Sequence, residues 1–252
     1  MRNGVAVLMS EEIPMNFRYA LGAALLAVCL LPAAAEAARP TPTFRPLGVS
    51  VRPATPARSI ATCNLGVTGP AVFTVSYVIP PDDQYYTLLD PAEQGCEAQG
   101  GVQIPAAHIG VEFQYAYETP IRVGIVQADL SNPECPVPVP GAYLCPPTDY
   151  MLAGPGTGAY DVTLPLATSC TLTGPAFLEI TFTEWGDWWE VPGLLLTGQC
   201  APCNSYNYYP GDHYDLCTFG FEGNPIMYVD AVADAALPVA RGTWGRIKTM
   251  HR

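Results

Sequence analysis

Eight cysteines lie downstream of an apolar leader, and their even number is the feature that most restricts how this chain folds. In an exported protein an even set of cysteines is normally disulfide-bonded, so we expect four disulfides that cross-link a surface-rich fold. Spacing by itself leaves the connectivity open, although a Cys135–Cys145 bridge would close one short loop and Cys217 is a partner for the nearby cysteines. The eight cysteines are Cys63, Cys96, Cys135, Cys145, Cys170, Cys200, Cys203 and Cys217.

The leader runs from Arg18 through about a dozen apolar residues to a small-residue end at Ala37, the pattern of a secretory signal peptide. Its apolar run is shorter than the about 20 residues of a membrane span, and the rest of the chain contains no such run. We therefore expect residues 1–37 to be removed during export to the periplasm or the extracellular space. Met15 is the more conventional start, because Glu11 and Glu12 precede the positive residue of the leader.

Charge is distributed very unevenly along the chain. Residues 60–240 contain 20 Asp or Glu and one basic residue, Arg122, which gives this segment a net charge of −19. Phosphate backbones are bound by Lys and Arg, so the composition excludes nucleic acid as a partner and disfavours an anionic membrane surface. The unpaired carboxylates either keep the protein soluble or bind a divalent cation.

Short segments with alternating apolar residues predict β-strands, and turn residues separate them. Residues 108–117 and 121–130 predict a hairpin, and residues 131–149 predict a proline-rich loop that closes on itself through Cys135 and Cys145. Leu178, Ile180 and Phe182 are expected to face inward, and Glu179 and Thr181 outward. The remaining predicted strands are 71–79, 84–89, 160–166, 194–196 and 226–232.

Strands without intervening helices predict an all-β fold. We expect an antiparallel two-sheet sandwich of jelly-roll or Greek-key type, cross-linked by disulfides. The predicted organisation is a signal peptide at 1–37, a proline-rich linker at 38–59, the sandwich at 60–236 and a flexible basic tail at 237–252.

Several short segments give the chain a weak resemblance to uncharacterised secreted, cysteine-rich bacterial proteins. These segments are Gly101-Val-Gln-Ile, Pro120-Ile-Arg-Val, Leu164-Pro-Leu, Gly174-Pro-Ala-Phe-Leu, Tyr206-Asn-Tyr-Tyr-Pro-Gly and the Cys-Pro pairs, within residues 85–232. The resemblance implies export and assigns no activity or site residue.

An aromatic and acidic cluster follows the strand predicted at 176–183 and is the best candidate for ligand binding. Tryptophan faces stack on sugar rings, and neighbouring carboxylates accept hydrogen bonds from hydroxyl groups. The alternative is that these rings close the end of the sandwich, and the same ambiguity applies to the tyrosines further on. The candidates are Glu184, Trp185, Asp187, Trp188, Trp189, Glu190, Tyr206, Tyr208 and Tyr209.

Other chemistry is poorly supported by the sequence. Cys200-Ala-Pro-Cys203 is followed by a poor helix start, so structural disulfides are favoured over a redox motif. Asp212 and Asp215 offer oxygens for Ca²⁺, although no EF-hand spacing is present, and no other cofactor is predicted. Glu179, together with Glu184, Asp187 or Glu190, is a candidate carboxylate pair for a glycoside hydrolase.

Nucleophile motifs are absent, and His108 and His213 are the only histidines before the tail. We therefore expect an exported, non-catalytic binding or surface-structural domain, with a glycan or another cell-surface component as partner. The alternatives are an extracellular carbohydrate-active hydrolase and a purely structural envelope or filament component.

Overall fold

The computed structural model describes residues 40–47, 62–75, 82–96, 100–184, 192–209 and 212–233. The chain divides into two compact units, Met1–Ala38 and Arg39–Arg252, and all described residues belong to the second. These residues form strands and no helix. The strands are β1 (Thr43–Pro46), β2 (Thr62–Gly66), β3 (Phe73–Val75), β4 (Asp83–Leu89), β5 (Val102–Phe113), β6 (Glu118–Asp129), β7 (Val137–Ala153), β8 (Gly158–Leu172), β9 (Ala176–Phe182), β10 (Gly193–Leu196), β11 (Ser205–Tyr209), β12 (Asp212–Asp215) and β13 (Met227–Ala233).

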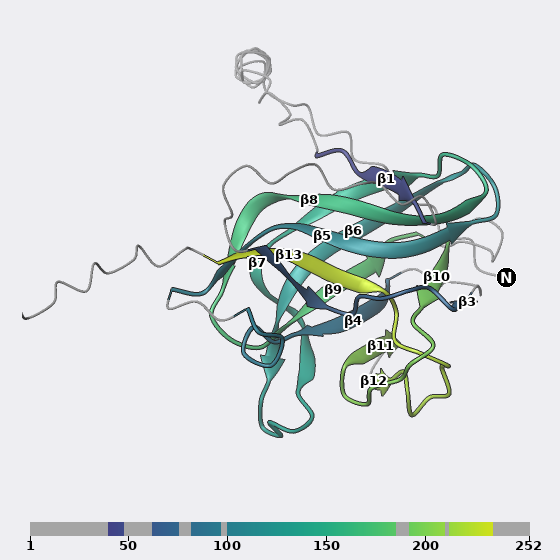
Figure 1. Cartoon of the computed structure of the whole chain (residues 1–252). Helices are drawn as coiled ribbons and strands as arrows, with labels where there is room; N and C mark the ends of the chain where they lie inside the picture. Colours follow the sequence, from purple (N-terminus) through teal and green to yellow (C-terminus); the bar gives the residue numbers. More distant parts are fainter. Residues whose placement is uncertain are drawn as a thin grey trace, which may run out of the picture. The chain divides into compact units, whose positions relative to one another are not determined.

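The strands form two antiparallel sheets, which confirms the predicted sandwich (Figure 1). In the seven-stranded sheet, β1, β8 and β5 are neighbours, and the other edge of β5 pairs with β13 along its first part and with β10 further on. β2 lies beyond β13, and β3 lies beyond β10. The six-stranded sheet has the order β12-β11-β4-β9-β6-β7.

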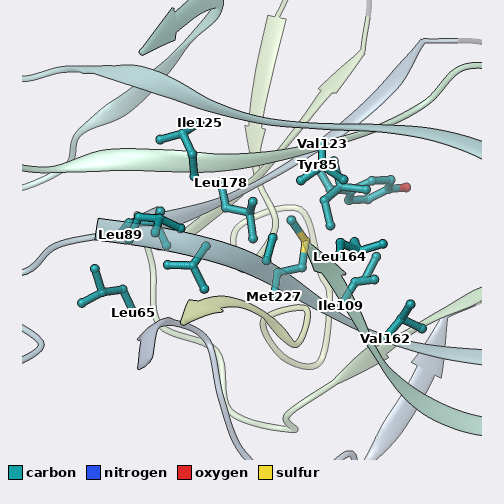
Figure 2. Close-up of a cluster of buried hydrophobic side chains, with 14 of the residues drawn as sticks. Leu65, Tyr85, Leu89, Ile109, Val123, Ile125, Val162, Leu164, Leu178 and Met227 are labelled. Atoms are coloured by element: carbon teal, nitrogen blue, oxygen red, sulfur yellow. The ribbon is translucent and has the colours of Figure 1, made fainter. Parts of the chain in front are cut away.

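Apolar side chains from both sheets meet in one core, shown in part in Figure 2. Ile109, Leu164 and Met227 come from the seven-stranded sheet, and Val123 and Leu178 come from the six-stranded sheet; all five are buried. The alternating pattern of the sequence therefore selects the inner face correctly, because successive side chains of a strand point to opposite faces.

The hairpin predicted from residues 108–130 is wrong. β5 and β6 lie in different sheets, and residues 114–117 connect them. Four residues reach across the roughly 10 Å between packed sheets. Two apolar strands joined by a short loop can pair through their backbones in one sheet or pack through their side chains from two sheets. The alternation of apolar residues is the same in both cases, so it does not distinguish them.

The self-closing loop predicted at residues 131–149 is also wrong, because most of it belongs to β7. β7 is an edge strand of the six-stranded sheet, where Pro138, Pro140, Pro146 and Pro147 are tolerated on the free side or at a break in the pairing; Pro146 and Pro147 lie at a register shift against β6. Register shifts interrupt its pairing with β6 between Val123 and Ala128.

Four disulfides cross-link the described residues, as the cysteine count predicts. Cys63 is bonded to Cys96, Cys135 to Cys203, Cys145 to Cys170, and Cys200 to Cys217. The predicted partnership of Cys217 is confirmed, and the Cys135–Cys145 bridge is wrong. Cys145–Cys170 joins β7 of one sheet to β8 of the other. Four disulfides indicate an oxidising extracellular or periplasmic environment.

The segment predicted as a proline-rich linker contributes a strand. Thr43–Pro46 form β1 and pair with β8, and Phe44 packs edge-on against Phe113 at 6.0 Å between ring centroids. The predicted signal peptide, the rest of the predicted linker except residues 40–42 and 47, and the predicted basic tail lie outside the described residues. Within the described part, no helix is long and apolar enough to cross a membrane.

Candidate functional site

The aromatic and acidic cluster predicted to bind ligand lies almost entirely outside the described residues. This applies to Trp185, Asp187, Trp188, Trp189 and Glu190. Glu184 is described, and its side chain is exposed just after the end of β9.

The predicted tyrosines follow one another on β11 and differ in their surroundings. Tyr206 is only 4% exposed; its hydroxyl donates to the Pro136 carbonyl at 2.9 Å and its ring packs against Phe177, so this ring is part of the protein interior. Tyr208 is half-buried and contacts the ring of His213 at 5.0 Å between centroids. Tyr209 lies in β11, and its side chain is outside the described residues.

The two aspartates suggested for Ca²⁺ do not converge. They are three residues apart on β12, so their side chains point to opposite faces of the strand. Asp215 accepts hydrogen bonds from the backbone N–H groups of Cys203, Cys217 (2.8 Å) and Thr218 (3.2 Å), and Asp212 is exposed. Across the described ranges, no group of three or more His, Cys, Asp or Glu side chains is arranged to hold a metal ion.

A surface pocket of about 340 Å³ lies where the end of β2 meets the segment after β10. Its volume is in the range of small-molecule sites. Among the described residues, no acidic, basic or histidine side chain lines it. The lining residues are Gly66, Val67, Thr68, Thr197, Gln199, Cys200, Ala201, Asn204 and Asn224.

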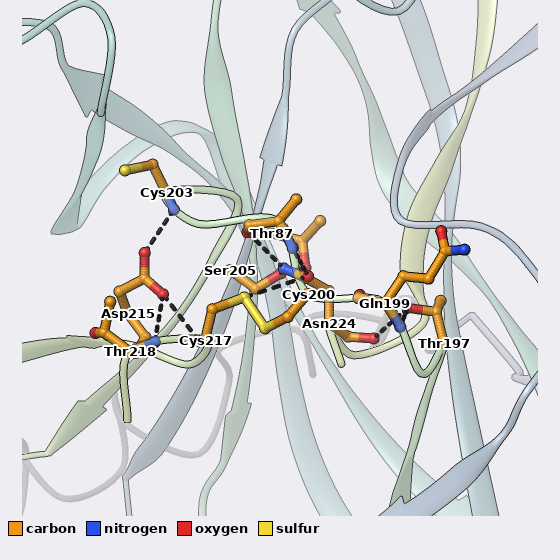
Figure 3. Close-up of a disulfide and its surroundings, with 11 residues drawn as sticks. Thr87, Thr197, Gln199, Cys200, Cys203, Ser205, Asp215, Cys217, Thr218 and Asn224 are labelled. Carbon is orange, nitrogen blue, oxygen red and sulfur yellow. Dashed lines mark hydrogen bonds between the residues drawn. A yellow bond between two sulfur atoms is a disulfide. The ribbon is translucent and has the colours of Figure 1, made fainter. Parts of the chain in front are cut away.

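Asn224 holds the floor of this pocket in place (Figure 3). It is 2% exposed and exchanges two hydrogen bonds with Ala201: the Ala201 N–H donates to Oδ1 at 2.7 Å, and Nδ2 donates to the Ala201 carbonyl at 3.3 Å. Nδ2 also donates to the Ser205 hydroxyl at 2.9 Å, and that hydroxyl lies 3.4 Å from the Thr87 hydroxyl. The Asn224 amide thereby joins its own segment to residues 201–205, and the Ser205 hydroxyl extends the connection to Thr87 on β4.

The Cys200–Cys217 disulfide forms part of the pocket wall and fastens it to the turn after β12. Cys203 is bonded instead to Cys135, so the two cysteines of Cys200-Ala-Pro-Cys203 belong to different bridges. This connectivity agrees with the predicted structural role of the motif. Asp215, through its bonds to Cys203 and Cys217, connects the two bridged segments (Figure 3).

The opposite rim of the pocket is fixed at Gly66. Its φ of 110° lies in the left-handed region, and a Cβ there would lie 2.6 Å from the Met227 carbonyl oxygen. The Gln94 side chain accepts a hydrogen bond from the Gly66 N–H at 3.0 Å and donates to its carbonyl at 3.2 Å. Only glycine fits this position, and the two hydrogen bonds with Gln94 hold its backbone in place.

Three lining side chains are free to bind a ligand. Within the described part of the chain, Thr68, Gln199 and Asn204 form no side-chain hydrogen bond with the protein, and Thr68 and Gln199 are exposed. A hydroxyl group and two amides both donate and accept hydrogen bonds without carrying charge. The pocket is therefore suited to a neutral ligand rich in hydroxyl or amide groups.

Glu179, a candidate acid in the sequence, lies on the outer face of the six-stranded sheet as predicted, but it is fully buried there. The hydroxyls of Tyr143 and Thr181 donate to its Oε1 at 2.5 and 3.2 Å, and Oε2 has no hydrogen-bond partner among the described residues. Gly124, opposite Glu179 on β6, makes room for Tyr143, because a Cβ there would lie 2.4 Å from its ring.

A network centred on His108 crosses the outer face of the seven-stranded sheet and was not predicted. Its Nδ1 lies 3.4 Å from Asp161 Oδ1, and its Nε2 lies 3.1 Å from Asp230 Oδ2. Its ring stacks on Tyr228 at 4.3 Å, and the Tyr228 hydroxyl donates to Asp161 at 2.9 Å. Arg45 also pairs with Asp161.

Burial by itself would lower the pKa of His108, but the hydrogen bonds and charges of Asp161 and Asp230 outweigh it and raise the pKa to about 9. The imidazole is therefore protonated at neutral pH, and in that state it has no lone pair with which to accept a proton. The alternating pattern around residue 108 reveals only which face the histidine occupies. Its partners on β8 and β13 are distant in sequence, so no local signal marks them.

Comparisons with known proteins give no relative: no family model, no curated protein and no solved structure matches the chain.

Proposed function

We propose that this protein is an exported, non-catalytic binding domain that holds a short neutral glycan in the pocket beside Cys200–Cys217. The observation that carries this proposal is the lining of the pocket, which combines the free polar groups of Thr68, Gln199 and Asn204 with a floor fixed by Asn224. Sugar hydroxyls donate and accept in the same way as these side chains do. A prearranged set of partners lowers the cost of ordering on binding.

The electrostatics favour a neutral ligand over an anionic one. Between residues 60 and 240 the chain carries 20 acidic residues against one basic residue, and the described residues that line the pocket include no cation. Uronic acids, sialic acids and sulfated sugars would meet repulsion without a compensating partner. The pocket volume suits one or two sugar rings rather than a long chain.

No acid is found among the described residues that line the pocket, which argues for binding rather than hydrolysis there. A glycoside hydrolase needs two carboxyl groups roughly 5 to 10 Å apart on either side of the scissile bond. Of the candidate acids, Glu179 and Glu184 are described and neither lines the pocket; Glu179 is buried and accepts a hydrogen bond from Tyr143.

A glycan array of neutral and anionic oligosaccharides, probed with the oxidised mature protein, tests the proposal. We expect retention on neutral glycans only. Gln199→Ala is expected to weaken retention by about tenfold, the equivalent of one good hydrogen bond. Gln103→Ala, at an exposed position on β5, is the matched control and is expected to retain glycan normally.

Further variants separate the alternatives. If Trp188→Ala and Trp189→Ala abolish retention, the predicted tryptophan cluster contributes the stacking surface that the pocket lining lacks. Reducing-sugar release that disappears in Glu184→Gln or Glu190→Gln would replace the proposal with a hydrolase. Self-assembly without any glycan retention would replace it with a structural envelope or filament component.

A further inference from the structure

We infer that the Cys200–Cys217 disulfide is a reducible latch of the pocket: its cleavage by a dithiol reductant opens the pocket wall and releases the ligand. The release of ligand depends on the proposed function. The selective reduction of this disulfide and the opening of the wall are independent of the proposed function, because they are inferred from contacts within the protein.

Accessibility singles out this disulfide. Reduction begins with attack of an external thiolate on a disulfide sulfur, so its rate depends on access to that sulfur. Cys200 is the one exposed member of the eight disulfide-bonded cysteines, all of which are described. Cys96 and Cys170 are buried, and the other five are half-buried.

Cys200 also lies in the wall of the pocket. Cys200 stands between Gln199 and Ala201, which both line it, and its partner Cys217 lies on the turn that Asp215 organises. Cys217 Sγ is 3.6 Å from Asn224 Oδ1, the atom that accepts the Ala201 N–H (Figure 3). Cleavage therefore removes the covalent tie next to the two hydrogen bonds that hold the wall at Ala201.

The reaction balances with a dithiol as the only co-reactant. One of its thiolates attacks Cys200 Sγ, the Cys200–Cys217 bond breaks, and Cys217 leaves as a thiolate that takes up a proton. The second thiol of the reductant then displaces Cys200. Two protein thiols are formed, and the reductant becomes a disulfide.

Limited reduction of the oxidised mature protein with dithiothreitol under native conditions tests the latch. Thiols are trapped with iodoacetamide and assigned by peptide mapping, and amide hydrogen exchange is followed in the same samples. Cys200 and Cys217 are expected to be labelled first. The exchange rate of the Ala201 amide is expected to rise about tenfold or more, because the loop closed by Cys200–Cys217 no longer resists breakage of the Ala201–Asn224 hydrogen bond. The Gly110 amide, bonded to the Ile226 carbonyl at 2.8 Å, is the control and is expected not to change.

Labelling of a different pair first, or unchanged exchange at Ala201 after Cys200 is labelled, overturns the latch. Binding of maltotriose, cellotriose and tri-N-acetylchitotriose is measured in parallel by calorimetry. If the oxidised protein binds none of these trisaccharides, the proposed function loses support, while labelling order and exchange still decide the latch. Cys200→Ser with Cys217→Ser gives a permanently open form. Cys145→Ser with Cys170→Ser is the matched loss of a bridge whose cysteines do not adjoin any lining residue.

Discussion

Replacement of His108 by glutamine removes the positive charge at the centre of the network on the seven-stranded sheet. The folded-state pKa of about 9 lies above the ordinary value of 6.5, so protonation favours the folded state. The stabilisation is fully present below pH 6.5 and is lost as the pH rises through 9. His108→Gln is therefore expected to cost most stability in mild acid and progressively less in alkali.

The size of this effect follows from the shift. Each pKa unit corresponds to about 1.36 kcal/mol, so a rise from 6.5 to about 9 gives about 3 kcal/mol. The side chain of Asp161 is 6% exposed, so solvent hardly screens its interaction with His108 and its contribution is retained. Asp230 is 44% exposed, and solvent screening reduces its share. We expect a loss of about 2 to 3 kcal/mol at pH 6 and little difference at pH 10.

Urea unfolding of the disulfide-intact protein, followed by circular dichroism between pH 6 and pH 10, measures this difference. His213→Gln is the matched control. Burial outweighs the charge of Asp212 and lowers the pKa of His213, so this ring is neutral above pH 7 and its replacement should have a flat effect from pH 7 to 10. If His108→Gln costs the same at pH 6 and pH 10, stacking on Tyr228 rather than charge stabilises the network, and the reasoning is refuted.

Two further changes test the six-stranded sheet. Burial outweighs the Asn207 hydrogen bond and raises the pKa of Asp83 from 3.8 to about 6, so the folded state loses stability as the pH rises from 4 through 6. The free energy of unfolding of Asp83→Asn, relative to the wild type, should therefore increase by up to about 3 kcal/mol between pH 4 and pH 7. A difference that does not depend on pH would contradict this. Gly124→Ala should destabilise the protein by about 1 to 3 kcal/mol, because the added methyl group meets the Tyr143 ring. Gly174→Ala is the control: Gly174 has open space around it, so the change should be near neutral in thermal unfolding. Equal effects of the two substitutions would argue against the contact.

The strands were predictable because side-chain alternation is a local property. The segment from Ala176 to Phe182 shows both the strength and the limit of this signal. Its inner face was assigned correctly, but its outer face was expected to meet solvent and is buried beneath Tyr143 and its neighbours. Burial of the second face depends on β7, whose prolines made it resemble a loop. An edge strand tolerates such residues, and edge position is a property of the sheet rather than of the segment.

The pocket was beyond sequence reasoning for a related reason. Thr68, Gln199 and Asn224 are ordinary polar residues in loops, without a motif or a charge to mark them. Asn224 reaches Ala201 and Ser205 because the backbone before β13 is hydrogen-bonded to β10 and the segment after it, from Ile226 to Leu195 and from Asn224 to Thr197 and Gln199. The aromatic cluster around Trp188 is conspicuous in the sequence and lies outside the described residues, so its role remains a prediction.

The sequence by itself determined the all-β class, the four disulfides and the inner face of most strands, because alternation and cysteine count are fixed along the chain. Only the tertiary structure decided which cysteines pair, that β5 and β6 face each other across the core, and where His108 finds its carboxylates. The physical reason is that strand pairing and disulfide bonding join residues far apart in the chain, and the energy of such contacts depends on how the sheets are assembled.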